Sequence, residues 1–326
     1  MEFWAHMSEI NREAFLGIDT SNYRTSVALY YTDGTYISSR KLLPVPFGEK
    51  GLRQNDAVFA HVKQFAEVFD KLDLENTVIK GVGVSFAPRN TAGSYMPCFS
   101  FGCSVAEALA HTMSVPCLRF SHQQGHIAAG LVSCGRLDLL EHPFYAVHAS
   151  GGTTEIVSVA GIENITISAK TRDISIGQLI DRTGVALGLS FPSGPELENL
   201  ANGYTDKFKI KIDLKDGDCC LSGYENKVLD FIKQGKTSEY IASYITEVCG
   251  YTLSEMLLFL QKQDPRPVLC AGGVMANERI KNIINDSFSK NDYEPPNFAS
   301  VELSGDNAVG IAYLAYNNLM FNKGEI

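Results

Sequence analysis

FLGIDTSNYRTSVAL, residues 15–29, predicts a buried strand, a tight polar turn and a second strand. The stretch FYAVHASGGTTEIVS, residues 144–158, repeats this plan, so that Ser21 aligns with Ser150. Turns rich in Gly, Ser and Thr expose backbone N–H groups and hydroxyls that can bind a phosphate. Although one such turn is most often a plain hairpin, two in register predict two lobes of common plan that bind one nucleotide.

Strands and helices are expected to alternate along the rest of the chain. A strand is predicted at residues 77–85, and another at residues 267–273 enters a glycine turn. The predicted helices span residues 98–113, 177–189, 196–201, 238–263, 278–285 and 306–321. Asn277 is positioned to cap the helix that follows it. Alternation of this kind predicts an α/β fold.

The bulk composition indicates a globular protein of two domains, because 326 residues with 45% hydrophobic content can bury two cores. We expect an N-terminal extension at residues 1–14, a first α/β lobe from residues 15–141 with 305–326, and a second lobe from residues 142–304. The first lobe would carry a metal site and the second the nucleotide-binding turns. A net charge of −9 argues against unaided binding of nucleic acid. Eight cysteines without a CxxC pair favour a reducing cytoplasm, and no apolar run approaches the ~20 residues of a membrane span.

A metal site is predicted by the pentapeptide HQQGH, from His122 to His126, together with the distant Asp306. The two histidines lie one helical turn apart on the same face, and the aspartate can complete a set of three ligands. The HExxH motif of metalloproteases has a glutamate beside the first histidine as general base. Gln123 occupies that position and cannot act as a base, so a metalloprotease is the weakest of the functions considered. Spacing alone leaves open two histidines satisfied by hydrogen bonds.

Eight motifs follow one another along nearly the whole chain, over residues 15–319. They are GIDTS at 17–21, HxxxH at 122–126, SGGTT at 150–154, GQLIDR at 177–182, FPSGPELE at 191–198, SGYE at 222–225, AGGVMAN at 271–277 and SGDNAVGIA at 304–312. In this order they resemble the TsaD/Gcp family, the tRNA threonylcarbamoyladenosine synthases formerly called glycoproteases. The resemblance implies an α/β, two-lobed actin/sugar-kinase-like (ASKHA) fold with a central nucleotide and metal cleft, in agreement with the internal repeat.

The resemblance implies an acyltransferase that moves a threonylcarbamoyl group from an acyl-adenylate to tRNA adenosine and releases AMP. Its cofactors would be one divalent metal ion, iron or zinc, and an adenine nucleotide, as acyl-adenylate, AMP or ATP. His122, His126 and Asp306 would hold the metal. A Lewis acid and N–H donors would stabilise the charge that develops on the carbamoyl and phosphate oxygens.

The resemblance also assigns residues that bind the nucleotide and substrate, namely Ser150, Gly151, Gly152, Asp181, Gly194, Glu198 and Asn277. The first three would form the phosphate-facing turn, and Asp181 would accept hydrogen bonds from the ribose hydroxyls. Gly194 and Glu198 would line the nucleoside pocket, and Asn277 would contact the base or the ribose.

The chain departs from the family pattern around the reacting group. Residues 22–25 stand where the family has an acidic pair after its serine, and residues 87–97 replace its TAGPGL loop. Both segments are predicted turns that face the cleft, so Arg24 and Arg89 are candidates for recognising the carboxylate of the acyl group. A solvated surface arginine is the alternative for each.

Two other functions stay open, a carbamoyltransferase paralogue with a different acceptor and a nucleotide-binding, non-catalytic partner of the true synthase. Loss of the acidic pair supports the non-catalytic partner, whereas three converging metal ligands argue against it. Taken alone, Asp181 can pair with Arg182, and Asp306 can be a plain helix N-cap. We expect tRNA to be presented with protein partners, a smaller paralogue and an ATPase, in the cytoplasm and away from membranes. Either a homodimer or a heterodimer would fit the sequence.

Overall fold

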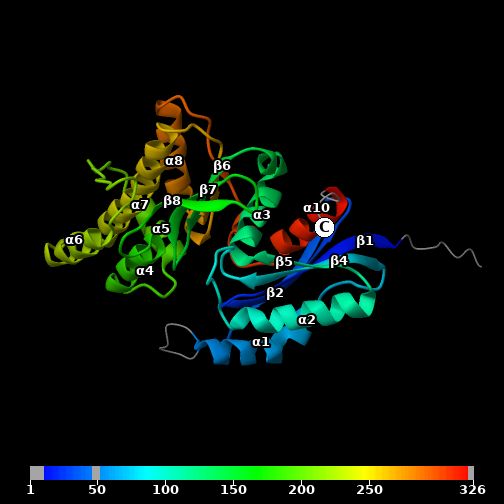
Figure 1. Cartoon of the computed structure of the whole chain (residues 1–326). Coiled ribbons are helices and arrows are strands. Elements are labelled where there is room, and N and C mark those ends of the chain that lie inside the picture. The colour runs from blue at the N-terminus through cyan, green and yellow to red at the C-terminus, as the bar shows by residue number, and fades with distance from the viewer. Residues whose placement is uncertain (1–10, 46–51, 322–326) are drawn as a thin grey trace, which may run out of the picture. The chain divides into compact units, whose positions relative to one another are not determined.

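The structure, a computed structural model, describes residues 11–45 and 52–321, and the chain divides into two compact units (Figure 1). The first unit comprises Met1–Val132 with Asp306–Ile326, and the second comprises Ser133–Gly305. The helix near the end of the sequence therefore folds with the first strands. Residues 1–10 of the expected N-terminal extension lie outside the described residues, whereas residues 12–14 belong to the first strand.

The first unit is built on a five-stranded sheet with helices on both faces (Figure 1). Its elements are β1 (Arg12–Thr20), β2 (Arg24–Tyr31), β3 (Tyr36–Leu42), α1 (Gln54–Phe69), β4 (Thr77–Ala87), α2 (Cys98–Met113), β5 (Cys117–Ser121), α3 (His122–Cys134) and α10 (Val309–Phe321). The strand order is β3-β2-β1-β4-β5, with β1 antiparallel to β2 and parallel to β4. Helices α1 and α2 cover one face of the sheet, and α10 covers the other (Figure 1).

The second unit is built on a sheet of the same design. Its elements are η1 (Leu137–Glu141), β6 (Phe144–Ala149), β7 (Thr154–Val159), β8 (Ile165–Lys170), α4 (Ile176–Ala186), α5 (Gly194–Asn202), α6 (Ser222–Lys233), α7 (Ser238–Gln261), β9 (Val268–Ala271), η2 (Gly273–Ala276), α8 (Glu278–Lys290), β10 (Asn297–Phe298) and α9 (Val301–Ser304). The strand order is β10-β9-β6-β7-β8. Strand β6 pairs antiparallel with β7 and parallel with β9, as β1 does with β2 and β4. The predicted internal repeat is confirmed in the strand pairing.

Most helices predicted from the sequence are confirmed. Helix α2 has the predicted bounds, α7 ends two residues earlier than expected at Gln261, and α4 ends at Ala186 rather than at residue 189. Asn277 caps α8, because its Oδ1 accepts the backbone N–H of Ile280 at 3.0 Å. The predicted cap of α8 is therefore confirmed.

The last helix begins later than predicted, at Val309 instead of Asp306. Asp306 lies three residues before the first residue of α10 and is therefore not its N-cap, and its carboxylate accepts a hydrogen bond from Ser21. Asn307 instead accepts the backbone N–H of Val309 at 3.0 Å. The sequence analysis does not predict strands β3, β5 and β8 or helices α1 and α6. Strand β5 has only five residues, and α6 has few buried apolar positions.

Two further properties concern the thiols and the helices. All eight cysteines are free. Burial raises the pKa of Cys98 to about 12 and that of Cys219 to about 11, so both thiols stay protonated at neutral pH. Within the part of the chain that the structure describes, the helices lack the combination of length and apolar character needed to cross a membrane.

Helix α10 approaches β1 and α3 so closely that only glycine fits at the contacts. A Cβ atom on Gly310 would collide with the backbone of α3 at Gly125. A Cβ atom on Gly17 in β1 would collide with the backbone at Ala308. Because backbone atoms cannot move aside as a flexible side chain does, these contacts fix the start of α10, and with it Asp306, against β1 and α3.

We expect Gly310→Ala to destabilise the protein by about 1–3 kcal/mol, because overpacking against a backbone forces the helices apart. Gly223→Ala is the matched control, since Gly223 lies in α6 and no atom of the described residues lies within 4 Å of the added methyl group. The melting temperature, followed by circular dichroism, should fall for Gly310→Ala and stay or rise for Gly223→Ala. Equal melting temperatures would mean that α10 can shift without cost.

Candidate metal centre and nucleotide-binding turns

Three potential metal ligands come together in the first unit. His122 is the first residue of α3, His126 follows one turn later, and Asp306 lies just before α10. The two Nε2 atoms are 3.0 Å apart, and Asp306 Oδ1 lies 3.2 Å from His126 Nε2 and 3.6 Å from His122 Nε2. The three ligand atoms lie within 4.8 Å of one another, and the side chains are 10–20% exposed. The fold thus joins two histidines of one helix to an aspartate 180 residues away.

A carboxylate lies behind the first imidazole. His122 Nδ1 is 3.0 Å from Oδ1 of Asp19, which is fully buried in β1, and the hydroxyl of Ser85 donates to the same oxygen. With its Nδ1–H donating to Asp19, a neutral His122 would have its Nε2 lone pair directed at His126 and Asp306. The second oxygen of Asp19 has no hydrogen-bond partner among the described residues. Metal-binding histidines commonly have a carboxylate on the other ring nitrogen, and this arrangement fits that pattern.

The charges in the cluster also fit a cation. Burial alone would lower the pKa of His122, but the carboxylates of Asp19 and Asp306 raise it well above its usual value. Burial alone would raise the pKa of Asp306, but the two imidazoles lower it well below its usual value. The carboxylates therefore create a negative potential at the imidazole nitrogens. A divalent ion bound by these three residues would neutralise that potential.

The turn between β1 and β2 holds the other oxygen of Asp306. The hydroxyl of Ser21 donates to Asp306 Oδ2 at 2.5 Å and accepts the backbone N–H of Arg24 at 3.3 Å. Arg24 is half-buried and is the first residue of β2. One of the two arginines predicted to recognise the acyl group therefore lies in the turn that contacts Asp306.

The second of these arginines lies in a loop that contacts the start of α3. Arg89 is half-buried, and its backbone N–H donates to the hydroxyl of Ser94 at 3.0 Å. The carbonyl of Pro88, one residue before, accepts the backbone N–H of Gln123 at 3.1 Å. Because Gln123 follows His122 directly, both segments that depart from the family pattern border the metal cluster.

In the second unit, the turn between β6 and β7 is open to solvent. Gly151 and Gly152 are exposed, and no atom of the described residues lies within 4 Å of a Cβ built on either. Helix α4 begins against this turn, because the hydroxyl of its N-cap Ser175 donates to the carbonyl of Gly151 at 2.9 Å. Gly177, in the first turn of α4, has no room for a Cβ beside the backbone of Ser150. An open glycine backbone beside a helix N-terminus is suited to bind an anion.

Asp181 lies on α4 and faces the start of α5. Its Oδ1 accepts the backbone N–H of Ser193 at 2.8 Å, and burial raises its pKa. Arg182, the ion-pair partner of Asp181 considered from the sequence, forms its ion pair with Glu225 instead, at 2.8 Å. Asp181 thus remains compatible with the predicted contact to a ribose.

The remaining candidates lie where α5 meets α8. Glu198 Oε1 accepts the backbone N–H of Glu278 at 2.8 Å, and Asn277 caps the same helix. Both side chains therefore accept hydrogen bonds that stabilise the N-terminus of α8. Gly194, at the first position of α5, has open space where a Cβ would lie.

Four residues around the metal cluster are missed by the sequence analysis as functional candidates, namely Asp19, Ser21, Ser85 and His61. Asp19 offers one usable signal, since an aspartate inside an apolar strand is rarely buried without a partner. Ser21 belongs to a quoted motif but has no assigned role there. His61 and Ser85 carry no local signal, because their contacts arise only from tertiary packing.

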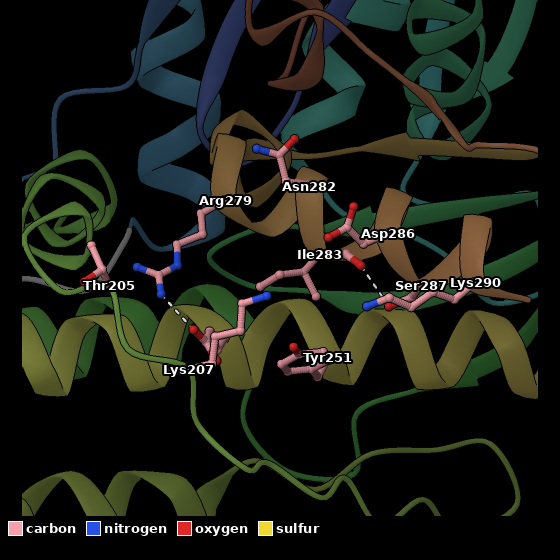
Figure 2. A pocket seen from close by; sticks show the side chains of 10 residues that line it. Thr205, Lys207, Tyr251, Arg279, Asn282, Ile283, Asp286, Ser287 and Lys290 are labelled. Atoms are coloured by element: carbon pink, nitrogen blue, oxygen red, sulfur yellow. Dashed lines mark hydrogen bonds and ion pairs between the residues drawn. The ribbon is translucent and has the colours of Figure 1, made fainter.

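A separate cavity of about 160 Å³ lies between residues 205–207, α7 and α8 (Figure 2). Figure 2 shows the side chains of Lys207, Arg279 and Lys290 around it. Arg279 is engaged in the fold, since its guanidinium binds the buried Glu247 at 2.7 Å. The described residues that line this cavity include none of the predicted metal or nucleotide ligands.

Comparison of the sequence with known families and proteins identifies relatives along most of the chain. The sequence model of TsaD, tRNA N6-adenosine threonylcarbamoyltransferase, matches residues 57–313. The tRNA N6-adenosine threonylcarbamoyltransferase of Kosmotoga olearia is 29% identical over 315 residues, which cover 92% of this chain and 92% of the relative. That of Polynucleobacter necessarius is 26% identical over 345 residues, with 95% of this chain and 94% of the relative covered.

Solved structures share the fold at low sequence identity. Component A of (R)-2-hydroxyglutaryl-CoA dehydratase from Acidaminococcus fermentans has a TM-score of 0.53 and 14% identity, covering 94% of this chain and 98% of that chain. Full-length HypF in its phosphate- and nucleotide-bound form has a TM-score of 0.57 and 14% identity, covering 96% of this chain and 56% of that chain. Likeness at this identity shows the fold alone, and it confirms the predicted two-lobed, actin/sugar-kinase-like α/β class.

We expect Asp19→Asn to weaken the binding of a divalent ion by about 10–100-fold, because a neutral amide supports the His122 imidazole less than a carboxylate does. Asp33→Asn is the matched control, since Asp33 lies in an exposed turn of the same unit and pairs with Arg12 at 2.7 Å. Dissociation constants for zinc can be measured by competition with a chromophoric chelator. Equal affinities in wild type and Asp19→Asn would remove Asp19 from the metal centre.

Proposed function

The chain belongs to the TsaD family, the tRNA N6-adenosine threonylcarbamoyltransferases, and we propose that it transfers a threonylcarbamoyl group from an acyl-adenylate to tRNA adenosine with release of AMP. The transferase class follows from the family. The acyl-adenylate donor, the metal and the individual residue roles are the parts that we add. The metal and the residue roles are supported by contacts within each unit.

The observation that carries the proposal is the convergence of His122, His126 and Asp306 in front of the buried Asp19. Two imidazoles and a carboxylate suit either zinc or iron, which are the ions we propose. When bound, such an ion supplies a Lewis acid that polarises a carbamoyl or phosphate oxygen. Gln123, beside the first histidine, offers no carboxylate to act as the base of a metalloprotease.

We propose that the open turn at residues 150–152 binds a phosphate of the adenine nucleotide. Its exposed backbone at Gly151 and Gly152 lies against the N-terminus of α4, whose dipole favours an anion. Asp181 would accept the ribose hydroxyls from the same helix. We also propose that the nucleoside is contacted by Gly194, Glu198 and Asn277.

In the proposed reaction, the exocyclic amine of adenosine forms a C–N bond with the carbamoyl carbon, and the bond from that carbon to the phosphate oxygen of AMP breaks. The amine gives up a proton to solvent, and AMP leaves with the electron pair of the broken bond. Fixed N–H donors at the phosphate stabilise the charge that develops there, so that the protein supplies orientation and electrostatics. A cysteine nucleophile is not part of the scheme. Cys219 is unsuitable because burial raises its pKa to about 11.

We propose that Arg24 and Arg89 recognise the carboxylate of the threonylcarbamoyl group. Both half-buried residues lie in segments that border the metal cluster, one joined to Asp306 through Ser21 and the other to α3 through Pro88. A guanidinium matches a carboxylate through two parallel hydrogen bonds. Arg24 would then lie where the family usually has an acidic pair, but its role would be to bind the acyl carboxylate.

A carbamoyltransferase with a different acceptor is a second candidate. It is favoured by the position of the altered turn, since residues 22–25 directly follow Ser21, whose hydroxyl donates to Asp306. A non-catalytic partner of the true synthase is less well supported, because a scaffold has no chemical need for the metal cluster. The transfer experiment below separates these candidates.

We propose that protein partners help to present tRNA, because a net charge of −9 opposes the approach of a polyanion. A smaller paralogue and an ATPase are the partners that we expect, in a homo- or heterodimeric arrangement. Eight free cysteines favour a reducing compartment, and the cytoplasm is the location that we propose.

We expect metal-loaded protein to transfer labelled threonine to tRNA when it is supplied with ATP, bicarbonate, an adenylate-forming enzyme and the partner proteins. His122→Ala should reduce the rate by about 100-fold or more, because the Lewis acid contributes several kcal/mol. His142→Ala is the matched control, since His142 is exposed in the second unit. A family member with the intact acidic turn serves as positive control. If the wild type transfers no label but binds AMP in a metal-dependent way, the acyl group or the acceptor differs from the one proposed.

We expect Arg24→Ala and Arg89→Ala each to weaken binding of the threonylcarbamoyl-adenylate by about 10–100-fold, the value of one hydrogen bond to a charged group. Affinity for AMP, which lacks the acyl carboxylate, should not change. Isothermal titration calorimetry with both ligands measures the difference. Unchanged affinity for the adenylate in either variant would remove that arginine from acyl recognition.

A further inference from the structure

We propose that His61 is a positioning residue for the metal centre, because its buried imidazole fixes the turn whose Ser21 hydroxyl orients Asp306. The inference rests on the proposed metal site and adds a residue to which neither the family motifs nor the sequence pattern assigns a role. All the residues involved belong to the first unit.

His61 is fully buried and lies on the face of α1 that packs against β2. Its Nε2 atom is 2.9 Å from the carbonyl oxygen of Ser21, and its Nδ1 atom is 2.7 Å from the hydroxyl of Thr25. The imidazole therefore contacts both ends of the turn between β1 and β2. Gln64, three residues further along α1, donates to the hydroxyl of Thr25 at 2.7 Å.

The direction of these hydrogen bonds follows from the chemistry of the partners. A carbonyl oxygen only accepts, so the Nε2 atom of His61 carries the proton and donates it to Ser21. In the neutral ring, Nδ1 then accepts from the hydroxyl of Thr25, whose oxygen in turn accepts from Gln64. Burial lowers the pKa of His61 and favours this neutral ring. Every donor in the group thus has a matching acceptor.

Through the hydroxyl of Ser21, the turn in its fixed position orients Asp306 in the metal cluster. The hydroxyl oxygen of Ser21 accepts the backbone N–H of Arg24 at 3.3 Å, so its single proton is free to donate to Asp306 Oδ2 at 2.5 Å. That bond leaves Oδ1 of Asp306 facing the two imidazoles, 3.2 Å from His126. The link from the carbonyl to the hydroxyl of Ser21 is covalent, so the chain of contacts transmits position and does not carry a proton.

A second contact from α1 supports the same role. The amide of Gln54, two helical turns before His61, donates to Asn22 Oδ1 at 2.6 Å, and its oxygen accepts the backbone N–H of Cys98 at 3.4 Å. Packing alone would need only apolar side chains on this face, since burial of polar groups costs free energy unless each is hydrogen-bonded. Helix α1 therefore holds the turn between β1 and β2 through matched polar contacts. Among them, His61 binds Ser21, the residue whose hydroxyl donates to Asp306.

The test uses two substitutions of His61, each of which places an amide nitrogen at the position of only one of the two ring nitrogens. The amide nitrogen of His61→Gln can reach the Nε2 position and donate to Ser21, whereas that of His61→Asn reaches only the Nδ1 position beside Thr25. We expect His61→Asn to weaken zinc binding by about 10–100-fold, as loss of an outer support does at metal sites, and His61→Gln to stay near wild type. His111→Asn, at an exposed position of α2, is the matched control.

The measurements are zinc affinity by chelator competition, the visible absorption spectrum of the cobalt(II)-substituted protein, and the melting temperature. A role for His61 in positioning predicts a changed cobalt spectrum in His61→Asn and its recovery in His61→Gln. Lower melting temperatures with unchanged zinc affinity and spectrum in both variants would overturn the inference and leave the metal centre standing. A wild type that binds no zinc or cobalt would overturn both the metal centre and the role of His61.

Ser21→Ala keeps the test decisive if His61→Asn fails to fold, because it removes the last link without touching α1. It should lower zinc affinity by a similar factor. If both variants fold, the double substitution should cost little more than either alone, since residues in one chain of contacts are not additive. Full additivity of the two effects would contradict a shared route to Asp306.

Discussion

The candidate metal centre depends on the close packing of α10 against β1 and α3. Gly17 and Gly310 permit contacts between backbones that a single methyl group would prevent. This packing brings Asp306, near the end of the sequence, to the imidazoles at the start of α3 and to the carboxylate of Asp19 in β1. The candidate ligand set is therefore a product of tertiary packing, and its geometry depends on the backbone contacts that create it.

The two repeats use one backbone design for different tasks. In the first, the hydroxyl of Ser21 accepts a backbone N–H of its own turn and donates to Asp306, so the turn's polar groups serve a neighbouring side chain. In the second, Gly151 and Gly152 carry no side chain and leave the backbone open at the N-terminus of α4. The strand pairing is the same in both repeats, so the difference lies in the turn residues and in the helices that pack against them. Internal symmetry of the sequence thus predicts shared architecture better than it predicts shared contacts.

The sequence is sufficient for features that depend on local spacing. The two strand–turn–strand repeats, the helix that carries His122 and His126, and the cap at Asn277 follow from periodicity and residue type within short windows. Contacts made across the sheet are different. The carboxylate of Asp19 meets Ser85 only because β1 and β4 are parallel neighbours, and His61 reaches the turn only because α1 packs on β2. A single sequence does not contain strand order or helix packing in a form that residue patterns can reveal.

Charge balance explains why this cluster suits a divalent ion better than a proton. Asp19 and Asp306 place two carboxylates in a largely buried site, and each would carry an uncompensated charge without a partner. A proton on His122 balances only one of them and directs an N–H at His126, whose Nε2 is 3.0 Å away. A dication would balance both carboxylates and would let both imidazoles bind it as neutral ligands. The support given to Asp306 by Ser21 would then matter most with a metal bound, because a carboxylate held on one oxygen can direct the other at the ion.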